Sequence, residues 1–152
     1  MQEQIRHTIE IGCTPNTLYR YVTQPWLWHE WHPNSRSAQA SVSELSVGDG
    51  FDEVIELQPL SPLPFTLRRE TRYTVLNANP DSHWCVEGRM SGGWLQIDYR
   101  FRESAGGVEF TRTLTYETRG LNRLLAPLLR PRMRQMSLLA LTNLKARLEV
   151  SG

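Results

Sequence analysis

Cysteine and long apolar runs are both scarce in this sequence of 152 residues. The two cysteines, Cys13 and Cys85, form no CxxC pair and have no set of histidines nearby. We therefore expect free, buried thiols in a reducing cytoplasm and no disulfide. No segment approaches the roughly 18 apolar residues that span a bilayer, and the opening MQEQIRHTIEIG lacks the charged-then-apolar pattern of a signal peptide. These absences predict a cytoplasmic protein without stable membrane insertion.

A charge excess of one sign is also missing, since 17 basic residues stand against 16 acidic ones. Such a balance gives no general attraction to nucleic acid or to anionic lipid. One stretch departs from it, because five arginines occur between residues 119 and 134 without an acidic residue. They are Arg119, Arg123, Arg130, Arg132 and Arg134. A solvated helical face is the favoured interpretation, and contact with an anion or a membrane surface is the alternative.

Motifs that mark nucleotide sites or nucleophiles are absent as well. The sequence contains no P-loop, no GxGxxG and no GxSxG. Its histidines are His7, His29, His32 and His83. No suitably spaced carboxylate completes a metal site with them, so we expect neither a metal nor another cofactor. An enzyme built on this chain would have to act by enclosure, orientation and acid–base help.

The N-terminal third alternates between strand and helix signals. Apolar and polar residues alternate over residues 5–11, which predicts a half-buried strand. Thr14 followed by Pro15 predicts a capped helix start. A second short helix is expected over residues 25–33, and it carries three tryptophans. One or two of these, Trp31 in particular, should pack in the core, while the remaining one lines a cavity mouth.

Between residues 35 and 117 turn signals recur about every ten residues, which predicts an antiparallel meander. Residues 59–64 (PLSPLP) are expected to form a loop, and residues 77–82 a turn. The expected strands cover residues 37–43, 51–57, 67–76, 83–90, 94–102 and 108–117.

After Gly120 the apolar period becomes helical. Pro127 and Pro131 should break or kink the first part, because proline lacks the amide donor and clashes with the preceding turn. A straight helix is therefore expected from Pro131 to about Glu149. It should pack on the sheet through Met136, Ala140 and Leu144.

The element order predicts one α+β domain over residues 1–152. A curved antiparallel sheet of six to seven strands would wrap around the long C-terminal helix, with two short helices after the first strand. Because one helix cannot fill a strongly curved sheet, we expect a ligand-sized cavity between them.

Several segments carry a family resemblance. They are the strand IRHTIEI, the stretch CTPNTLYRYVTQPWLWHEWHP with its Trp31-His32-Pro33, the turn from Gly48 to Gly50 and the terminal helix. From Ile5 to about Leu148 the chain resembles the SRPBCC, or START-like, helix-grip superfamily, which includes pollen allergens and START lipid carriers. The branch it looks most similar to is that of polyketide cyclase/dehydrase and lipid-transport proteins. The resemblance implies the helix-grip fold, but that fold serves both carriers and enzymes.

Three charged residues interrupt strand faces that are otherwise apolar, namely Glu53, Arg69 and Arg112. One interpretation is an internal Glu–Arg pair, or strand ends that reach water. The other is a polar anchor for a ligand carboxylate, phenol or enol, since the arginine fork suits planar anions. Glu53 could serve as an acid or base if burial raised its pKa.

Further candidates share the same inward faces. The predicted ligand-binding residues are Glu53, Arg69, Tyr73, Trp84, Gly88, Tyr99, Arg112, Met133 and Met136. The expected partner is a small, mainly apolar molecule, such as a lipid or an aromatic polyketide, with nucleic acid excluded. The alternative function is a cyclase, dehydratase or aromatase acting on such a molecule. A homodimer stays open, because symmetric association leaves no reliable mark in one sequence.

Overall fold

The structure, a computed structural model, describes residues 2–57, 67–119 and 122–151. Within these residues, seven strands, two α-helices and one 3-10 helix make up an α+β fold, as the sequence predicted. In chain order they are β1 (Gln2–Ile11), α1 (Pro15–Val22), η1 (Pro25–Glu30), β2 (Ser35–Ala40), β3 (Gly50–Leu57), β4 (Leu67–Asn79), β5 (His83–Met90), β6 (Gly93–Ser104), β7 (Gly107–Thr118) and α2 (Asn122–Ser151).

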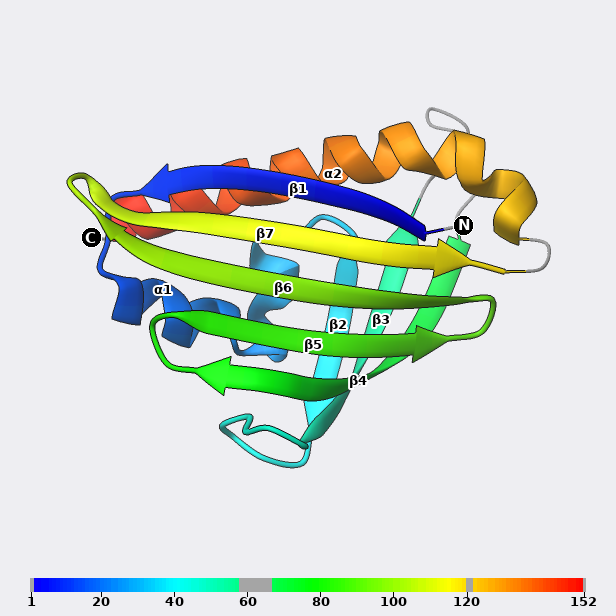
Figure 1. The fold of residues 1–152 in the computed structure, drawn as a ribbon, viewed down its shortest axis with the longest axis horizontal. Coiled ribbons are helices and arrows are strands. Elements are labelled where there is room, and N and C mark those ends of the chain that lie inside the picture. The colour runs from blue at the N-terminus through cyan, green and yellow to red at the C-terminus, as the bar shows by residue number, and fades with distance from the viewer. Residues whose placement is uncertain (1, 58–66, 120–121, 152) are drawn as a thin grey trace.

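The strands form one antiparallel sheet in the order β1-β7-β6-β5-β4-β3-β2. In Figure 1, β1, β7, β6 and β5 run across the view, while β2 and β3 run steeply to them, so the sheet curls strongly. A register shift between Val75 and Asn77 interrupts the pairing of β4 with β5. Such a bulge bends a strand and increases its twist. The helix α2 lies along the open side of the curl, which is the predicted helix-grip arrangement.

The two short helices begin where the sequence predicted. Thr14 caps α1, because its hydroxyl oxygen accepts a hydrogen bond from the Thr17 amide at 3.1 Å, and Pro15 follows in the first turn. The second helix is a 3-10 helix that ends at Glu30. It is tied to α1 by the Trp28 indole nitrogen, which donates to the Val22 carbonyl at 2.8 Å.

Several strand limits differ from the prediction. β2 begins at Ser35 and ends at Ala40, earlier than the expected 37–43. β4 continues to Asn79 instead of ending at residue 76. The bulge explains this second difference, because it lets Asn77 and Asn79 pair with β5 where a turn was expected. The predicted loop at residues 59–64 lies outside the described residues.

Of the two outcomes predicted for the prolines, a break or a kink, the structure shows the kink, and the helix begins before Pro131. α2 runs through both Pro127 and Pro131 as one helix from Asn122 to Ser151. In Figure 1 its first part, in orange, turns away from the axis of the rest, which is the bend that proline produces without ending a helix. Tertiary contact outweighed the local penalty, since Leu129, between the two prolines, is buried.

The core lies between the concave face of the sheet, α2 and the two short helices. Met136, Ala140 and Leu144 are buried there, as predicted. Aromatic rings fill its centre, where Phe51 and Tyr73 stack with centroids 4.7 Å apart. Trp31 is fully buried in the same cluster. None of the helices in the described parts of the chain is long and apolar enough to cross a membrane.

Candidate ligand-binding site

A cavity of two adjoining chambers lies between α2 and the concave face of the sheet. The inner chamber has a volume of about 80 Å³ and the outer one about 120 Å³. Ile55, Leu95 and Met133 line both, so the two chambers meet at these side chains. A single water molecule needs roughly 10–15 Å³ on the same scale. The inner chamber therefore has room for several waters or for the polar end of a small molecule.

Glu53 projects from β3 into the inner chamber and is only 5% exposed. Its Oε2 accepts a hydrogen bond from the Ser35 hydroxyl at 2.6 Å, and its Oε1 accepts one from the Tyr73 hydroxyl at 2.8 Å. Burial raises the pKa of this carboxyl to about 7, although both hydrogen bonds and the charge of Arg112 act in the opposite direction. Glu53 can therefore gain or lose a proton near neutral pH.

Arg112 enters the same chamber from β7 and is only 4% exposed. Its Nη1 donates to the Ser137 hydroxyl on α2 at 3.1 Å, and its guanidinium also lies beside the Tyr99 hydroxyl. The Nε atom is buried and has no hydrogen-bond partner in the described parts of the chain. None of the ion pairs among the described residues joins Arg112 to Glu53. Within the described residues, the chamber thus holds a cation without a carboxylate contact.

His32 completes the polar wall of the inner chamber. Its Nδ1 accepts a hydrogen bond from the Asn34 amide at 3.2 Å. Burial, helped by the positive charge of Arg112, lowers the pKa of His32 to about 3. The imidazole is therefore neutral at physiological pH and adds no charge to the chamber.

The outer chamber is mainly apolar. Met90 and Trp94 contribute from the β5–β6 hairpin, Tyr116 from β7, and Leu129 from α2. Two predicted candidates lie at this chamber, Arg69 on β4 and Met133 on α2. The cavity as a whole therefore has one polar end and one apolar end.

The predicted ligand-binding residues separate into two groups. Six of them line the cavity: Glu53, Tyr73, Tyr99 and Arg112 line the inner chamber, Arg69 the outer one, and Met133 both. Trp84, Gly88 and Met136 are buried but line neither chamber. None of these placements tests ligand binding itself, which stays a prediction for all nine.

Gly88 shows why facing inward differs from lining a cavity. A Cβ atom added there would lie 2.7 Å from Cε1 of Tyr73 and 2.8 Å from Cγ2 of Thr71. The Tyr73 ring fills the space in front of the glycine. Gly88 therefore supports the position of Tyr73, whose hydroxyl holds Glu53.

Five polar or aromatic residues of the inner chamber were not among the predicted site residues, namely Trp28, His32, Asn34, Ser35 and Ser137. Ser137 follows Met133 by four positions, so helical periodicity would have placed it on the same face of α2. For Ser35 and His32 no comparable signal existed, because both belong to the connection into β2. Of the three clustered tryptophans, the one at the cavity is Trp28.

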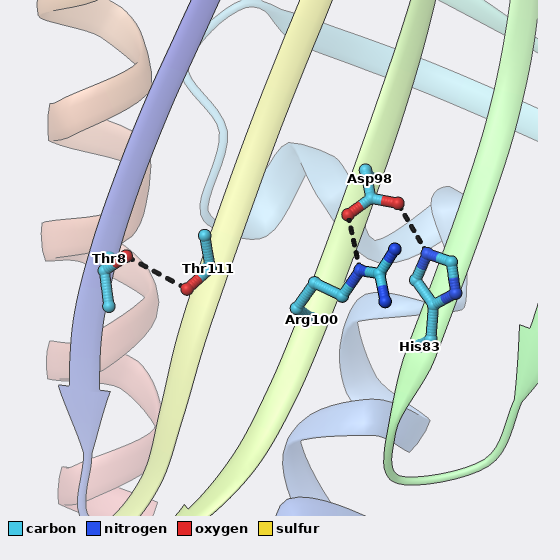
Figure 2. Close-up of polar contacts among 5 residues, drawn as sticks. All are labelled: Thr8, His83, Asp98, Arg100 and Thr111. Atoms are coloured by element: carbon cyan, nitrogen blue, oxygen red, sulfur yellow. Dashed lines mark hydrogen bonds and ion pairs between the residues drawn. The ribbon is translucent and has the colours of Figure 1, made fainter.

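The opposite face of the sheet carries a separate polar cluster (Figure 2). His83 Nε2 lies 2.5 Å from Asp98 Oδ1, and Arg100 Nε lies 3.2 Å from Asp98 Oδ2. Beside it the Thr8 and Thr111 hydroxyls are 2.9 Å apart, across β1 and β7. The described residues contain no group of three side chains suited to a metal ion.

The arginine-rich stretch is partly neutralised by neighbouring groups. Arg119 lies 3.7 Å from Glu117, and Arg130 pairs with Glu3 on β1. Arg132 donates to the Gln135 side chain at 3.0 Å. Two of these contacts are ion pairs and one is a hydrogen bond to a neutral amide, and both interpretations of the stretch stay predictions.

Comparison with known proteins shows to which family the chain belongs. The family described as polyketide cyclase / dehydrase and lipid transport matches residues 2–149. The chain belongs to this family. No curated protein matches it in sequence.

Several solved structures have the same fold as this member of the polyketide cyclase/dehydrase and lipid-transport family. Their sequence identity to it is low. The Zhui aromatase/cyclase of Streptomyces sp. R1128 aligns with a TM-score of 0.76 at 9% identity, covering 98% of this chain and 94% of that one. The protein TTHA0849 from Thermus thermophilus aligns at 0.75 and 15% identity, covering 99% of both chains. Ara h 8.0201 aligns at 0.67 and 11% identity over the full length of both. These likenesses support the fold and leave the ligand open.

Proposed function

We propose that this protein binds a small, mainly apolar molecule with one polar end in the two-chambered cavity. The observation that carries the proposal is the contrast between the chambers. An apolar outer chamber leads to an inner one in which Glu53, Arg112 and Ser137 present polar atoms. Ligand sites in proteins combine a mainly apolar wall with a few convergent polar groups in this way.

The family supports the same function at a coarser level. Its description joins cyclase and dehydrase enzymes with lipid transport, and both polyketides and lipids are mainly apolar molecules. The similar Zhui protein is titled an aromatase/cyclase. We therefore propose a lipid or an aromatic, polyketide-like molecule as the ligand class.

Met133 offers a direct test, because it lines both chambers at their junction. Met133→Trp should fill this junction and weaken one-to-one binding of an apolar fluorescent dye by at least about tenfold. Fluorescence titration measures the dissociation constant, and quenching of tryptophan emission reports proximity, since Trp28 and Trp94 line the cavity. Leu139→Trp is the matched control, because Leu139 is 41% exposed on the same helix. Equal affinity of both variants would show that the dye binds elsewhere.

A second candidate function is catalysis of the cyclase, dehydratase or aromatase type, and the state of Glu53 favours it. A carboxyl with a pKa near 7 can act as both acid and base at neutral pH. It could take a proton from the carbon beside a ligand carbonyl, while Arg112 stabilises the enolate oxygen, and then return that proton at another atom. Glu53→Gln would then retain ligand binding and lose turnover, whereas a pure carrier shows no turnover in either form.

A further inference from the structure

The charge balance of the inner chamber narrows the ligand class. Arg112 is 4% exposed, donates to no carboxylate of the described residues, and keeps a buried Nε without a partner among them. A buried charge without a counter-charge is unfavourable unless something neutralises it. Arginine remains protonated in proteins, so the neutralising group must come from elsewhere.

Glu53 lines the same chamber and could neutralise Arg112, but its carboxyl group has other hydrogen-bond partners. Its two oxygens accept hydrogen bonds from Ser35 and Tyr73, and none of the ion pairs among the described residues joins them to Arg112. Burial also favours its protonated form up to about pH 7, the value to which its pKa is raised. Below that pH the chamber carries the full positive charge of Arg112.

No other group that lines the chamber in the described part of the chain compensates for this charge. His32 is neutral, and the remaining polar groups are hydroxyls and an amide. The polar groups of the chamber come from several elements: Ser35 on β2, Tyr73 on β4, Tyr99 on β6, Arg112 on β7, Ser137 on α2, and His32 and Asn34 in the connection between η1 and β2. His7 on β1 lies beside Ser137, with its Nδ1 3.4 Å from the hydroxyl, and burial together with the charges of Arg134 and Arg112 lowers the pKa of His7.

We infer that the inner chamber is a carboxylate site, and that the ligand is an apolar monocarboxylate whose charged end meets Arg112 and the Ser137 hydroxyl. The planar fork of arginine matches a carboxylate, and a protonated Glu53 can donate a further hydrogen bond to it. The apolar body then passes Met133 into the outer chamber. This inference rests on the proposed function and specifies the polar end of the ligand.

The test compares matched ligands that differ only at that end. Decanoate and decanol serve for a straight chain, and 2-naphthoate and 2-naphthol for an aromatic body, with dissociation constants from calorimetry at pH 6. For at least one pair the carboxylate should bind about tenfold or more tightly than its neutral partner. Arg112→Met should weaken carboxylate binding by about 30-fold and change alcohol binding by less than about threefold. Arg102→Met is the control and should change neither, because its side chain is 76% exposed on β6 and pairs with Glu109.

The pH dependence gives an independent check on location. Above pH 7 an ionised Glu53 repels the ligand carboxylate, so the preference for the carboxylate should fall about tenfold between pH 6 and 8. In Glu53→Gln this fall should disappear. A carboxylate preference that is lost in Arg69→Met but kept in Arg112→Met would place the charge in the outer chamber and overturn the inference.

Failure of the inference is distinguishable from failure of the proposed function. If the alcohols bind and Met133→Trp blocks them, but no carboxylate is preferred, the cavity binds ligands and the carboxylate assignment is wrong. If no probe binds in a manner sensitive to Met133→Trp, both proposals fail. Because Arg112→Met removes an unneutralised buried cation, the variant should fold, and its far-ultraviolet circular dichroism verifies this.

Discussion

Leu144→Asp is expected to lower the free energy of unfolding by about 4–6 kcal/mol. Leu144 is 0% exposed on the inner side of α2 and belongs to the central apolar cluster. Loss of a buried leucine side chain alone costs about 3–5 kcal/mol, and a carboxyl placed there without a partner adds a desolvation penalty. Urea denaturation followed by tryptophan fluorescence measures the change.

Leu138→Asp provides the matched control for this effect. Leu138 lies on the same helix but is 55% exposed. Its replacement should cost about 0.5 kcal/mol or less, which reflects helix propensity only. Equal destabilisation by the two variants would mean that α2 presents a different face to the sheet.

As the pH rises, the free energy of unfolding of the wild type is expected to fall by about 3 kcal/mol because of Glu53, and Glu53→Gln should abolish this fall. The folded-state pKa of Glu53 is raised from 4.5 to about 7 by burial, so folding favours the protonated form. A raised pKa contributes stability that is fully present below about pH 4.5 and is lost as the pH rises through about 7. The wild-type free energy of unfolding should therefore fall across this window relative to that of Glu53→Gln, whose amide carries no charge at either end.

Ser35→Ala provides a second test of the raised pKa of Glu53. The Ser35 hydroxyl donates to Glu53 and lowers its pKa, so removal of this bond should shift the loss of stability to higher pH. Denaturation curves at half-unit intervals from pH 4.5 to 8 follow both effects. Parallel curves for the wild type and Glu53→Gln over this range would show that Glu53 is ionised without penalty, hence solvated.

These two residues illustrate how far sequence patterns reached. Leu144 lies on a helical apolar stripe, and its burial followed from periodicity alone. Glu53 was recognised as a charge on an apolar strand face, since the strand period of two assigned it to the side of Phe51 and Ile55. Whether it would pair with an arginine, reach water or anchor a ligand was left open, and so was whether burial would raise its pKa. The answer depends on Ser35 and Tyr73, which approach it from β2 and β4.

The limits of helices and strands were less predictable where local and tertiary preferences conflict. Pro127 and Pro131 indicated a broken or kinked helix, because proline removes a hydrogen bond within the segment. The structure keeps one bent helix, since burial of residues such as Leu129 supports it. Likewise the bulge near Val75 extends β4 through residues that favour turns.

The sequence by itself determined the α+β class, the antiparallel meander, the inward faces of the strands and the family, because each of these follows from periodicity and from motifs close together in the chain. Only the tertiary structure decided which inward residues line open space. Gly88 and Trp84 face inward yet pack against other rings, while Ser137 and His32 reach the chamber from segments far apart in the sequence. A cavity is the space that packing leaves unfilled, and that space depends on how the curl of the sheet and the bend of α2 bring distant side chains together.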